Sequence, residues 1–182
     1  KSNRALKTIY LRNNDVGAEG AAYLADALAV NTTVSILYLD RNHIGAAGAE
    51  HMARALAQPS STLTILCLDH NDIGPKGAHH FLAPLQQNRK LVQLYLCSNN
   101  LGAEGSWYFA EALRVNTTIT SAYFSGNAIG DEGAWYMSEA LQENKALETL
   151  YLGDNGIGDE GARHLAEALR ANSTLSNFDL QM

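Results

Sequence analysis

The sequence contains little of what a disulfide-stabilised, membrane-spanning or nucleic-acid-binding protein needs. Its 182 residues include only two cysteines, Cys67 and Cys97, too few for a disulfide scaffold or a four-ligand zinc site. No run approaches the roughly 20 apolar residues of a membrane span, and no apolar signal segment opens the chain. The formal net charge of −6 offers no concentrated basic surface to replace phosphate counterions. We therefore expect no membrane contact and no nucleic-acid partner.

The motifs of common catalytic sites are also missing. The chain has no G-x-S-x-G elbow and no phosphate-binding glycine loop, and its Gly-x-x-Gly elements recur in every repeat as turns. No two histidines stand three or four residues apart, the spacing at which one helix presents two zinc ligands. His51, His79, His80 and His164 therefore do not have the spacing of a helical zinc site. We therefore predict a protein that is not an enzyme and that holds no metal or cofactor.

What the chain does have is a repeat of about 28 residues. The frame L-x-x-L-x-L-x-x-N-x-I-G-x-x-G-A recurs at intervals of 28 residues, with one interval of 29. Such self-similarity is typical of a solenoid, in which each unit buries its apolar side against its neighbours. We predict a single domain over 1–182, with six full repeats and a terminal strand at 175–181. The repeats start near Leu6, Val34, Leu63, Leu91, Ile119 and Leu147.

Each repeat is predicted to form a short strand, residues 6–11 in the first repeat, followed by a helix. Apolar and polar side chains alternate across residues 9–11, the pattern of a strand with one buried face. Alanines and leucines such as Leu24 and Leu28 then fall on one side of an amphipathic helix. Pro84 stands in the middle of the third helical segment, where its ring costs about 3 kcal/mol unless the helix breaks.

Stacked strand–helix units form an arc, because helices are wider than the spacing of about 4.8 Å between strands. The predicted fold class is α/β, a curved solenoid with parallel strands on the concave side and helices on the convex side. An asparagine follows each strand, where its amide can satisfy backbone groups that the sheet leaves unpaired. We predict a structural role for this column, which comprises Asn14, Asn42, Asn71, Asn99, Asn127 and Asn155.

Strings such as LYLGDNGIGDEGARHLAEALRANSTL at 150–175 resemble leucine-rich repeats of the ribonuclease-inhibitor-like subfamily. They are most similar to the C-terminal repeat domain of NOD-like receptors, and the similarity extends over the whole chain. The resemblance implies a horseshoe that binds a protein ligand in its concavity, as a ligand-sensing or scaffold domain in innate immunity. The Ran GTPase-activating protein carries similar repeats. A GTPase-activating protein that donates Arg12 or Arg41 is therefore the alternative function.

The strand residues between the leucines supply the first candidate binding site. One concave column is rich in tyrosine, a residue enriched in binding hot spots because it combines a rigid face with a polar tip. The next column brings charge to the early repeats. The predicted partner-binding residues are Tyr10, Arg12, Tyr38, Asp40, Asp69, Tyr95, Tyr123 and Tyr151. Two alternatives stay open: the tyrosines stack on one another along the strands, and the charged column is a solvated face.

A second candidate site lies on the convex side. Trp107 and Tyr108 recur one repeat later as Trp135 and Tyr136, which predicts an aromatic patch across two neighbouring helices. A helical wheel directs the tyrosines away from the core and places the tryptophans at its flank. The alternative interpretation is that the tryptophans fill the groove between the helices.

The remaining expectations concern the cell compartment and the chain ends. Sequons at Asn31, Asn116 and Asn172 share one repeat position, so the repeat explains them without glycosylation, and we expect a cytoplasmic protein with unbridged cysteines. Glycan occupancy at Asn31 and Asn116 would instead indicate a secreted or host-directed decoy, such as an inhibitor of an extracellular enzyme. The chain begins without methionine, and we interpret it as a piece of a longer protein. The first repeat has little to cover it, so we expect fraying there or a weak symmetric homodimer through that end.

Overall fold

The computed structural model describes residues 3–181. Over these residues, seven strands of three residues each alternate with six helices of 12 to 14 residues. The strands are β1 (Thr8–Tyr10), β2 (Ile36–Tyr38), β3 (Ile65–Cys67), β4 (Gln93–Tyr95), β5 (Ser121–Tyr123), β6 (Thr149–Tyr151) and β7 (Asn177–Asp179). The helices are α1 (Gly17–Val30), α2 (Gly45–Leu56), α3 (Gly74–Gln87), α4 (Gly102–Val115), α5 (Gly130–Glu143) and α6 (Asp159–Ala171).

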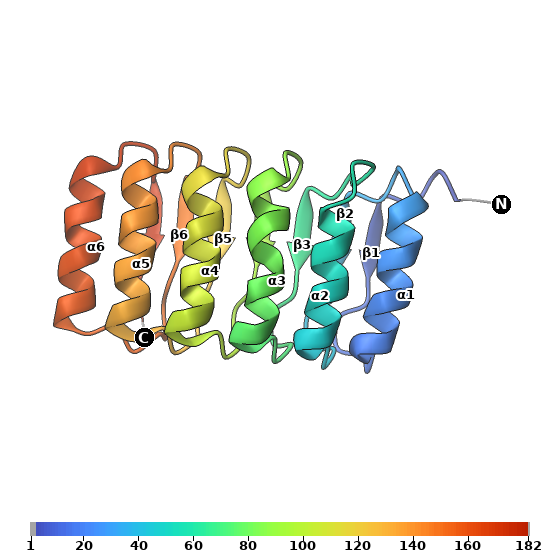
Figure 1. Cartoon of the computed structure of the whole chain (residues 1–182), viewed down its shortest axis with the longest axis horizontal. Coiled ribbons are helices and arrows are strands. Elements are labelled where there is room, and N and C mark those ends of the chain that lie inside the picture. Colours follow the sequence, from blue (N-terminus) through green and yellow to red (C-terminus); the bar gives the residue numbers. More distant parts are fainter. Residues whose placement is uncertain (1–2, 182) are drawn as a thin grey trace.

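All seven described strands form one open parallel sheet, in chain order from β1 to β7. Equivalent residues of successive repeats pair across it, as Tyr10 does with Tyr38 and Tyr95 with Tyr123. The helices all lie on one side of this sheet (Figure 1). This arrangement confirms the predicted α/β solenoid. We call the side of the sheet away from the helices the strand face, and the outer side of the helix row the helix face.

The strands are shorter than the predicted first strand, but parallel hydrogen bonding continues past their ends. The backbone N–H of Leu11 donates to the carbonyl oxygen of Tyr38, and that of Asn13 donates to the carbonyl oxygen of Asp40. The donor–acceptor distance is 2.9 Å in both bonds. Asn13 itself has a left-handed backbone, with φ of 57°. The chain therefore leaves the regular strand conformation while still paired with the next repeat, and it begins to turn toward the helix.

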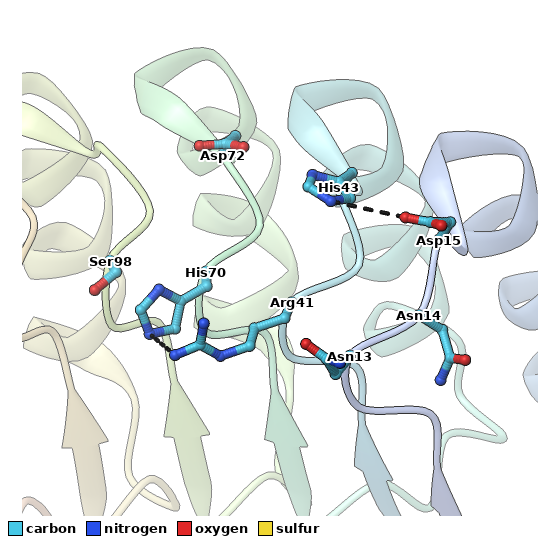
Figure 2. A pocket seen from close by; sticks show the side chains of 8 residues that line it. All are labelled: Asn13, Asn14, Asp15, Arg41, His43, His70, Asp72 and Ser98. Carbon is cyan, nitrogen blue, oxygen red and sulfur yellow. Dashed lines mark hydrogen bonds and ion pairs between the residues drawn. The ribbon is translucent and has the colours of Figure 1, made fainter.

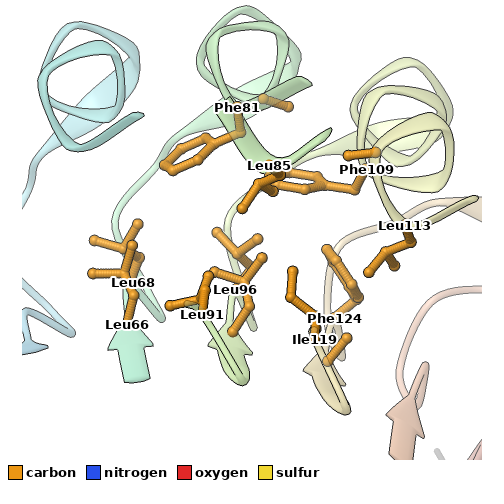
Figure 3. Close-up of a cluster of buried hydrophobic side chains, with 14 of the residues drawn as sticks. Leu66, Leu68, Phe81, Leu85, Leu91, Leu96, Phe109, Leu113, Ile119 and Phe124 are labelled. Carbon is orange, nitrogen blue, oxygen red and sulfur yellow. The ribbon is translucent and has the colours of Figure 1, made fainter. Parts of the chain in front are cut away.

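The core lies between the sheet and the helices (Figure 3). Leu66 and Leu68 of the third repeat are fully buried there, as are their equivalents in the neighbouring repeats. Phe81, Phe109 and Phe124 form a line of aromatic contacts across three repeats, with ring centroids 5.7 and 5.2 Å apart. Burying one such side chain stabilises the fold by about 1.5–3 kcal/mol. Much of this burial is against an adjacent repeat, which couples the repeats to one another.

Glycine at the start of each helix sets the spacing of the helix row. Gly45 has a φ of +61°, a conformation that side chains disfavour, and it starts α2. A Cβ atom at Gly48 would collide with the Ile44 side chain and would lie 3.2 Å from the Cα atom of Ala18 on α1. From α2 to α6, the second glycine of each Gly-x-x-Gly element therefore allows the helix to approach the preceding helix closely.

Helix α3 runs through Pro84 without a break. The carbonyl oxygen of Pro84 still accepts a hydrogen bond from the N–H of Asn88, over 2.9 Å. Of the two outcomes expected from the sequence, a broken helix or an accommodated ring, the structure therefore has the second. Packing against α2 and α4 holds α3 helical although the proline provides no N–H for its own turn.

The column of asparagines links each repeat to the next. Asn42 Nδ2 donates to the carbonyl oxygen of Leu39, over 2.9 Å, and to that of Leu11 in the preceding repeat, over 2.8 Å. Asn71 Oδ1 in turn accepts the backbone N–H of Asn42 over 2.9 Å. From Asn42 to Asn155 these side chains are at most 3% exposed. The predicted structural role is confirmed.

A second row of asparagines lies where the helices end. Asn116 Nδ2 donates to the carbonyl oxygen of Leu85 over 2.7 Å, and Asn116 Oδ1 accepts the N–H of Ile119 over 2.8 Å. Asn31 and Asn172 of the other two sequons make equivalent bonds to the residues that follow them. Asn116 is 2% exposed, so a glycan on its amide is incompatible with this fold. The repeat itself accounts for the sequons.

Within residues 3–181, no helix has the length and apolar character that crossing a membrane requires. In the same part of the chain, no three His, Cys, Asp or Glu side chains converge in a way that could hold a metal ion. Cys67 and Cys97 are free thiols, as predicted.

We predict that Asn127→Ala lowers the free energy of unfolding by about 3 kcal/mol or more, because several buried backbone groups lose their partner at about 1–3 kcal/mol each. Asn127 Nδ2 donates to the carbonyl oxygens of Leu96 and Phe124, and Asn127 Oδ1 accepts the backbone N–H of Asn99. Asn14→Ala is the matched control at the same repeat position. Asn14 is exposed, and its loss is expected to cost less than about 1 kcal/mol. Equal losses in urea unfolding would contradict a structural ladder.

A second variant tests the proline in α3. Pro84→Ala is expected to raise the free energy of unfolding by about 1–3 kcal/mol. The change restores an N–H donor to the helix and removes the steric clash between the proline ring and the preceding turn. All five other helices carry alanine at this repeat position, so the side chain has a precedent in the same fold. Urea unfolding of the two proteins provides the measurement. A loss of stability would show that the ring fills a space that alanine leaves empty.

Candidate functional site

The tyrosines of the strand face form one row across the sheet, which we call the tyrosine row (Tyr10, Tyr38, Tyr95, Tyr123 and Tyr151). Tyr10 stacks on Tyr38 with ring centroids 5.1 Å apart, and Tyr95 stacks on Tyr123 at 4.2 Å. Tyr151 meets Tyr123 edge to face at 5.1 Å. Tyr10 is 75% exposed, and the other four are half-buried by their neighbours. The expected stacking is therefore present, and it still leaves an aromatic surface open to solvent.

The tyrosine row is interrupted at Cys67, which pairs with Tyr95 in the sheet. Cys67 is 3% exposed, and its thiol donates to Asp69 Oδ2 over 3.6 Å. Burial raises the pKa of the Cys67 thiol, and burial also raises the pKa of Cys97 to about 12. A thiol with a raised pKa is a poor nucleophile at neutral pH. Neither cysteine is therefore equipped for covalent catalysis.

The charged column beside the tyrosine row is not simply a solvated face, which was the alternative to its predicted role in binding. Asp40 is only 1% exposed, and one of its carboxylate oxygens accepts a hydrogen bond from the Arg12 guanidinium. Burial raises the pKa of Asp40, but the Arg12 hydrogen bond lowers it, and the net pKa lies below the usual value. Asp40 Oδ1 has no hydrogen-bond partner among the described residues. The prediction that Asp40 offers an open binding contact is therefore wrong, because the neighbouring repeats and Arg12 cover it.

Asp69 is also partly withdrawn from solvent. Its Oδ1 atom accepts the backbone N–H of Cys97 in the next repeat, over 2.7 Å. Burial raises the pKa of Asp69, and the hydrogen bond from the Cys97 backbone opposes that rise without cancelling it. Arg12 is the exposed member of this cluster, with 69% of its side chain accessible. Any partner on this part of the strand face would meet Arg12 before either carboxylate.

A polar depression of about 490 Å³ lies where the first four strands turn toward the helices. Figure 2 shows Arg41 directed toward His70, and His43 toward Asp15. Arg41 Nη2 lies 3.3 Å from His70 Nε2, and His43 Nε2 lies 3.8 Å from Asp15 Oδ1. The lining comprises Asn13, Asn14, Asp15, Arg41, His43, His70, Asp72 and Ser98. Its charges are of both signs, so it favours no simple anion or cation.

Left-handed turn residues build this depression. Arg41 and His43 have φ of 57° and 53°, and His70 and Asp72 have φ of 54° and 52°. Of these residues the sequence drew attention to Arg41, as a possible donor to a GTPase, but not to His43 or Asp72. Asparagine and glycine at the equivalent positions of other repeats, such as Asn100, were the available signal for a left-handed turn.

The aromatic patch of the helix face has the opposite orientation to the one expected. Tyr108 and Tyr136 pack against the core, whereas Trp107 and Trp135 remain 38% and 42% exposed. Tyr108 leans toward α3, where its ring centroid lies 5.0 Å from that of His79. The helical-wheel expectation for these pairs was therefore wrong, because a neighbouring helix covers one flank of each helix and a single-helix wheel does not include it.

An apolar depression of about 270 Å³ lies beside α1 at the N-terminal end. Its lining includes Ile9, Leu24 and Leu28, together with Leu6, which is 43% exposed. Strand β1 pairs only with β2 among the described strands. Self-association through this end stays a prediction.

Two solved structures share this architecture over 93% of the chain, each at 19% sequence identity. Leiomodin-1 actin-binding site 2 matches with a TM-score of 0.55 over 82% of its own chain. The tropomodulin C-terminal domain of Caenorhabditis elegans matches with a TM-score of 0.54 over 86% of its own chain. At this identity the likeness shows the fold alone. No curated protein sequence matches the chain.

The family is shown by the sequence itself. A family model described as Leucine Rich repeat matches residues 2–25, 30–53, 60–79, 115–136 and 143–166. These segments make up more than half of the chain, and each covers one strand and the first part of the helix that follows it. The chain therefore belongs to the leucine-rich repeat family.

Proposed function

We propose that this chain is a non-catalytic recognition module that binds a partner protein mainly on its strand face. The observation that carries the proposal is the tyrosine row, five aromatic rings held in register by the parallel sheet. Residues 1–182 would act as one domain of six repeats. Within a longer protein, its place is that of the ligand-sensing or scaffold domain of a NOD-like-receptor-type molecule.

The tyrosine row is suited to protein binding because its rings are already ordered. Stacking and strand pairing limit the side-chain entropy that a partner would otherwise have to remove on binding. The hydroxyl groups supply polar contacts at the edge of an apolar surface; that of Tyr95 lies 3.0 Å from Gln93 Oε1. Arg12, exposed beside Tyr10, adds one positive charge at the first repeat.

The structural neighbours support a macromolecular partner of this kind. The leiomodin-1 structure is named for an actin-binding site. Actin filaments are therefore the first defined candidate to test, and co-sedimentation of the chain with filaments is the direct assay. A negative result would exclude actin filaments as the partner. It would leave open that another protein binds the strand face.

The cytoplasm is the proposed location. Two unbridged cysteines suit a reducing compartment, and the buried amide of Asn116 suits a chain that carries no glycan there. Intact mass measurement of the protein from its native source tests this directly, since a mass equal to that of the bare chain is expected. An added glycan on Asn31 would favour the secreted decoy instead.

The alternative function, activation of a GTPase by a donated arginine, now depends on Arg41. Arg12 is engaged by buried Asp40, whereas Arg41 is exposed and contacts the ring of His70. Under the proposed function, single-turnover GTP hydrolysis by purified small GTPases is unchanged when the chain is added. Acceleration that disappears in Arg41→Ala would establish the alternative.

The tyrosine row gives the main prediction. Proteins captured by the immobilised chain are identified and purified, and their affinity for variants is measured. Replacing both Tyr95 and Tyr123 by alanine is expected to weaken binding about 30-fold or more, because one hot-spot aromatic contributes about 2 kcal/mol or more and the contributions of neighbouring residues do not simply add. Because these rings stack at 4.2 Å, the double variant is also expected to lose about 1–2 kcal/mol of stability.

Tyr23→Ala on α1 is the matched control. Tyr23 is 66% exposed and lies on the helix side of the molecule, so its removal is expected to leave the affinity unchanged. Unaltered binding by the Tyr95/Tyr123 double variant would place the interaction on another surface. Equal weakening by Tyr23→Ala would show that the assay does not report on the strand face.

A further inference from the structure

A groove of about 300 Å³ runs between α4 and α5 on the helix face, and we call it the α4–α5 groove. Its lining side chains include Trp107 and Trp135, which keep 38% and 42% of their surface exposed. Large indoles exposed at equivalent positions of adjacent repeats are a costly surface for a monomer, and such patches mark contact sites. Tyr136, Arg114 and three glutamates complete the lining.

The groove is acidic. Glu111, Glu139 and Glu143 line it, with Arg114 as the only cation in the lining, so two negative charges remain. Arg114 is bound by Glu111 over 2.8 Å and lies 3.5 Å from Glu143. Glu139 forms no ion pair within the described chain and accepts only the Gln142 amide, over 3.3 Å. A cation is therefore the complementary ligand for the groove.

The next repeat holds an arginine between carboxylates on its own helix. Arg163 on α6 stands at the repeat position of Trp107 and Trp135. Its guanidinium pairs with Glu160, three residues before it, over 2.6 Å and with Glu167, four residues after it, over 2.7 Å. The arrangement is an arginine site formed within one helix.

The same two carboxylates recur in α4 and α5 without the arginine. Glu132 and Glu139 stand three before and four after Trp135, and Glu104 and Glu111 stand in the same way around Trp107. The carboxylate spacing that holds a guanidinium in α6 is thus repeated on two further helices, where an indole takes the place of the arginine. Guanidinium groups stack on aromatic faces and pair with carboxylates at once, which ammonium groups do less well.

We propose that the α4–α5 groove binds an arginine side chain from a basic segment of a partner protein. The guanidinium stacks on the indole of Trp107 or Trp135 and pairs with Glu139, which belongs to one of these recurring carboxylate pairs. It also pairs with Glu143, which belongs to neither pair but lines the same groove. This site is separate from the tyrosine row, which lies across the sheet from the helices, so either site can fail its test without the other.

Other occupants fit less well. A second copy of the chain in a symmetric contact would bring two acidic grooves together, which repels. A nucleic acid carries the same sign of charge as the groove. A purely apolar ligand would cover the glutamates without pairing them, at a desolvation cost.

The test uses a blocked hexa-arginine peptide as the probe, with hexa-lysine and hexa-glutamate peptides of the same form. Trp107 and Trp135 are the only tryptophans in the chain, so intrinsic tryptophan emission reports on this groove alone. At low ionic strength, hexa-arginine is expected to change the emission to saturation, hexa-lysine to bind several-fold more weakly, and hexa-glutamate to have no effect. Added salt is expected to weaken binding.

The variant pair Glu139→Gln with Glu143→Gln is expected to weaken hexa-arginine binding about 5-fold or more, because two partly exposed ion pairs are lost. The control pair Glu19→Gln with Glu148→Gln makes the same net charge change outside the groove and is expected to retain the affinity. Trp135→Leu, followed by calorimetry, tests the stacking contact and is expected to weaken binding. Equal affinities for the groove variant and the control, or for arginine and lysine peptides, would overturn the proposal.

Discussion

The hydrogen bonds of the buried asparagine ladder are the interaction on which the rest of this structure depends. Each turn from strand to helix leaves carbonyl and N–H groups that the sheet does not pair, and water does not reach them. One asparagine amide serves its own turn, the preceding repeat and, through its oxygen, the N–H of the preceding asparagine. Without that amide, several buried groups per repeat would be left bare, each at about 1–3 kcal/mol. The ladder therefore holds every repeat in one register.

Because the register is fixed, equivalent residues of successive repeats lie side by side and form continuous surfaces. Because Tyr10 stands beside Tyr38 and Tyr95 beside Tyr123, one tyrosine per repeat becomes a stacked aromatic row. The same rule on the helix face places Trp107 and Trp135 together on adjacent helices. Both candidate sites therefore arise from the scaffold's repetition. Variation at one position of the repeat, rather than a special loop, is what distinguishes one region of the surface from another.

Different physical effects decide which charged residues can meet a partner. Asp40 and Asp69 are in the same column as exposed Arg12, yet neighbouring repeats and local hydrogen bonds withdraw both carboxylates from solvent. The result is that Arg12 is the accessible charge of this column, beside the rings of the tyrosine row. On the helix face the carboxylates remain accessible, because helix residues that point outward have no adjacent layer to cover them. The two faces consequently present different chemistry to a partner.

The sequence by itself determined the period, the alternation of strand and helix, the inward leucines, the structural asparagines and the row of tyrosines. All of these follow from spacing along the chain and from which side chains favour water. Only the tertiary structure decided that α3 continues through Pro84, that Asp40 is buried, and that Tyr108 rather than Trp107 packs against the core. Each of these depends on what the neighbouring repeat places beside the residue. A pattern along a single repeat contains no information on that lateral contact. Packing between repeats overrides the local propensity that the pattern reports.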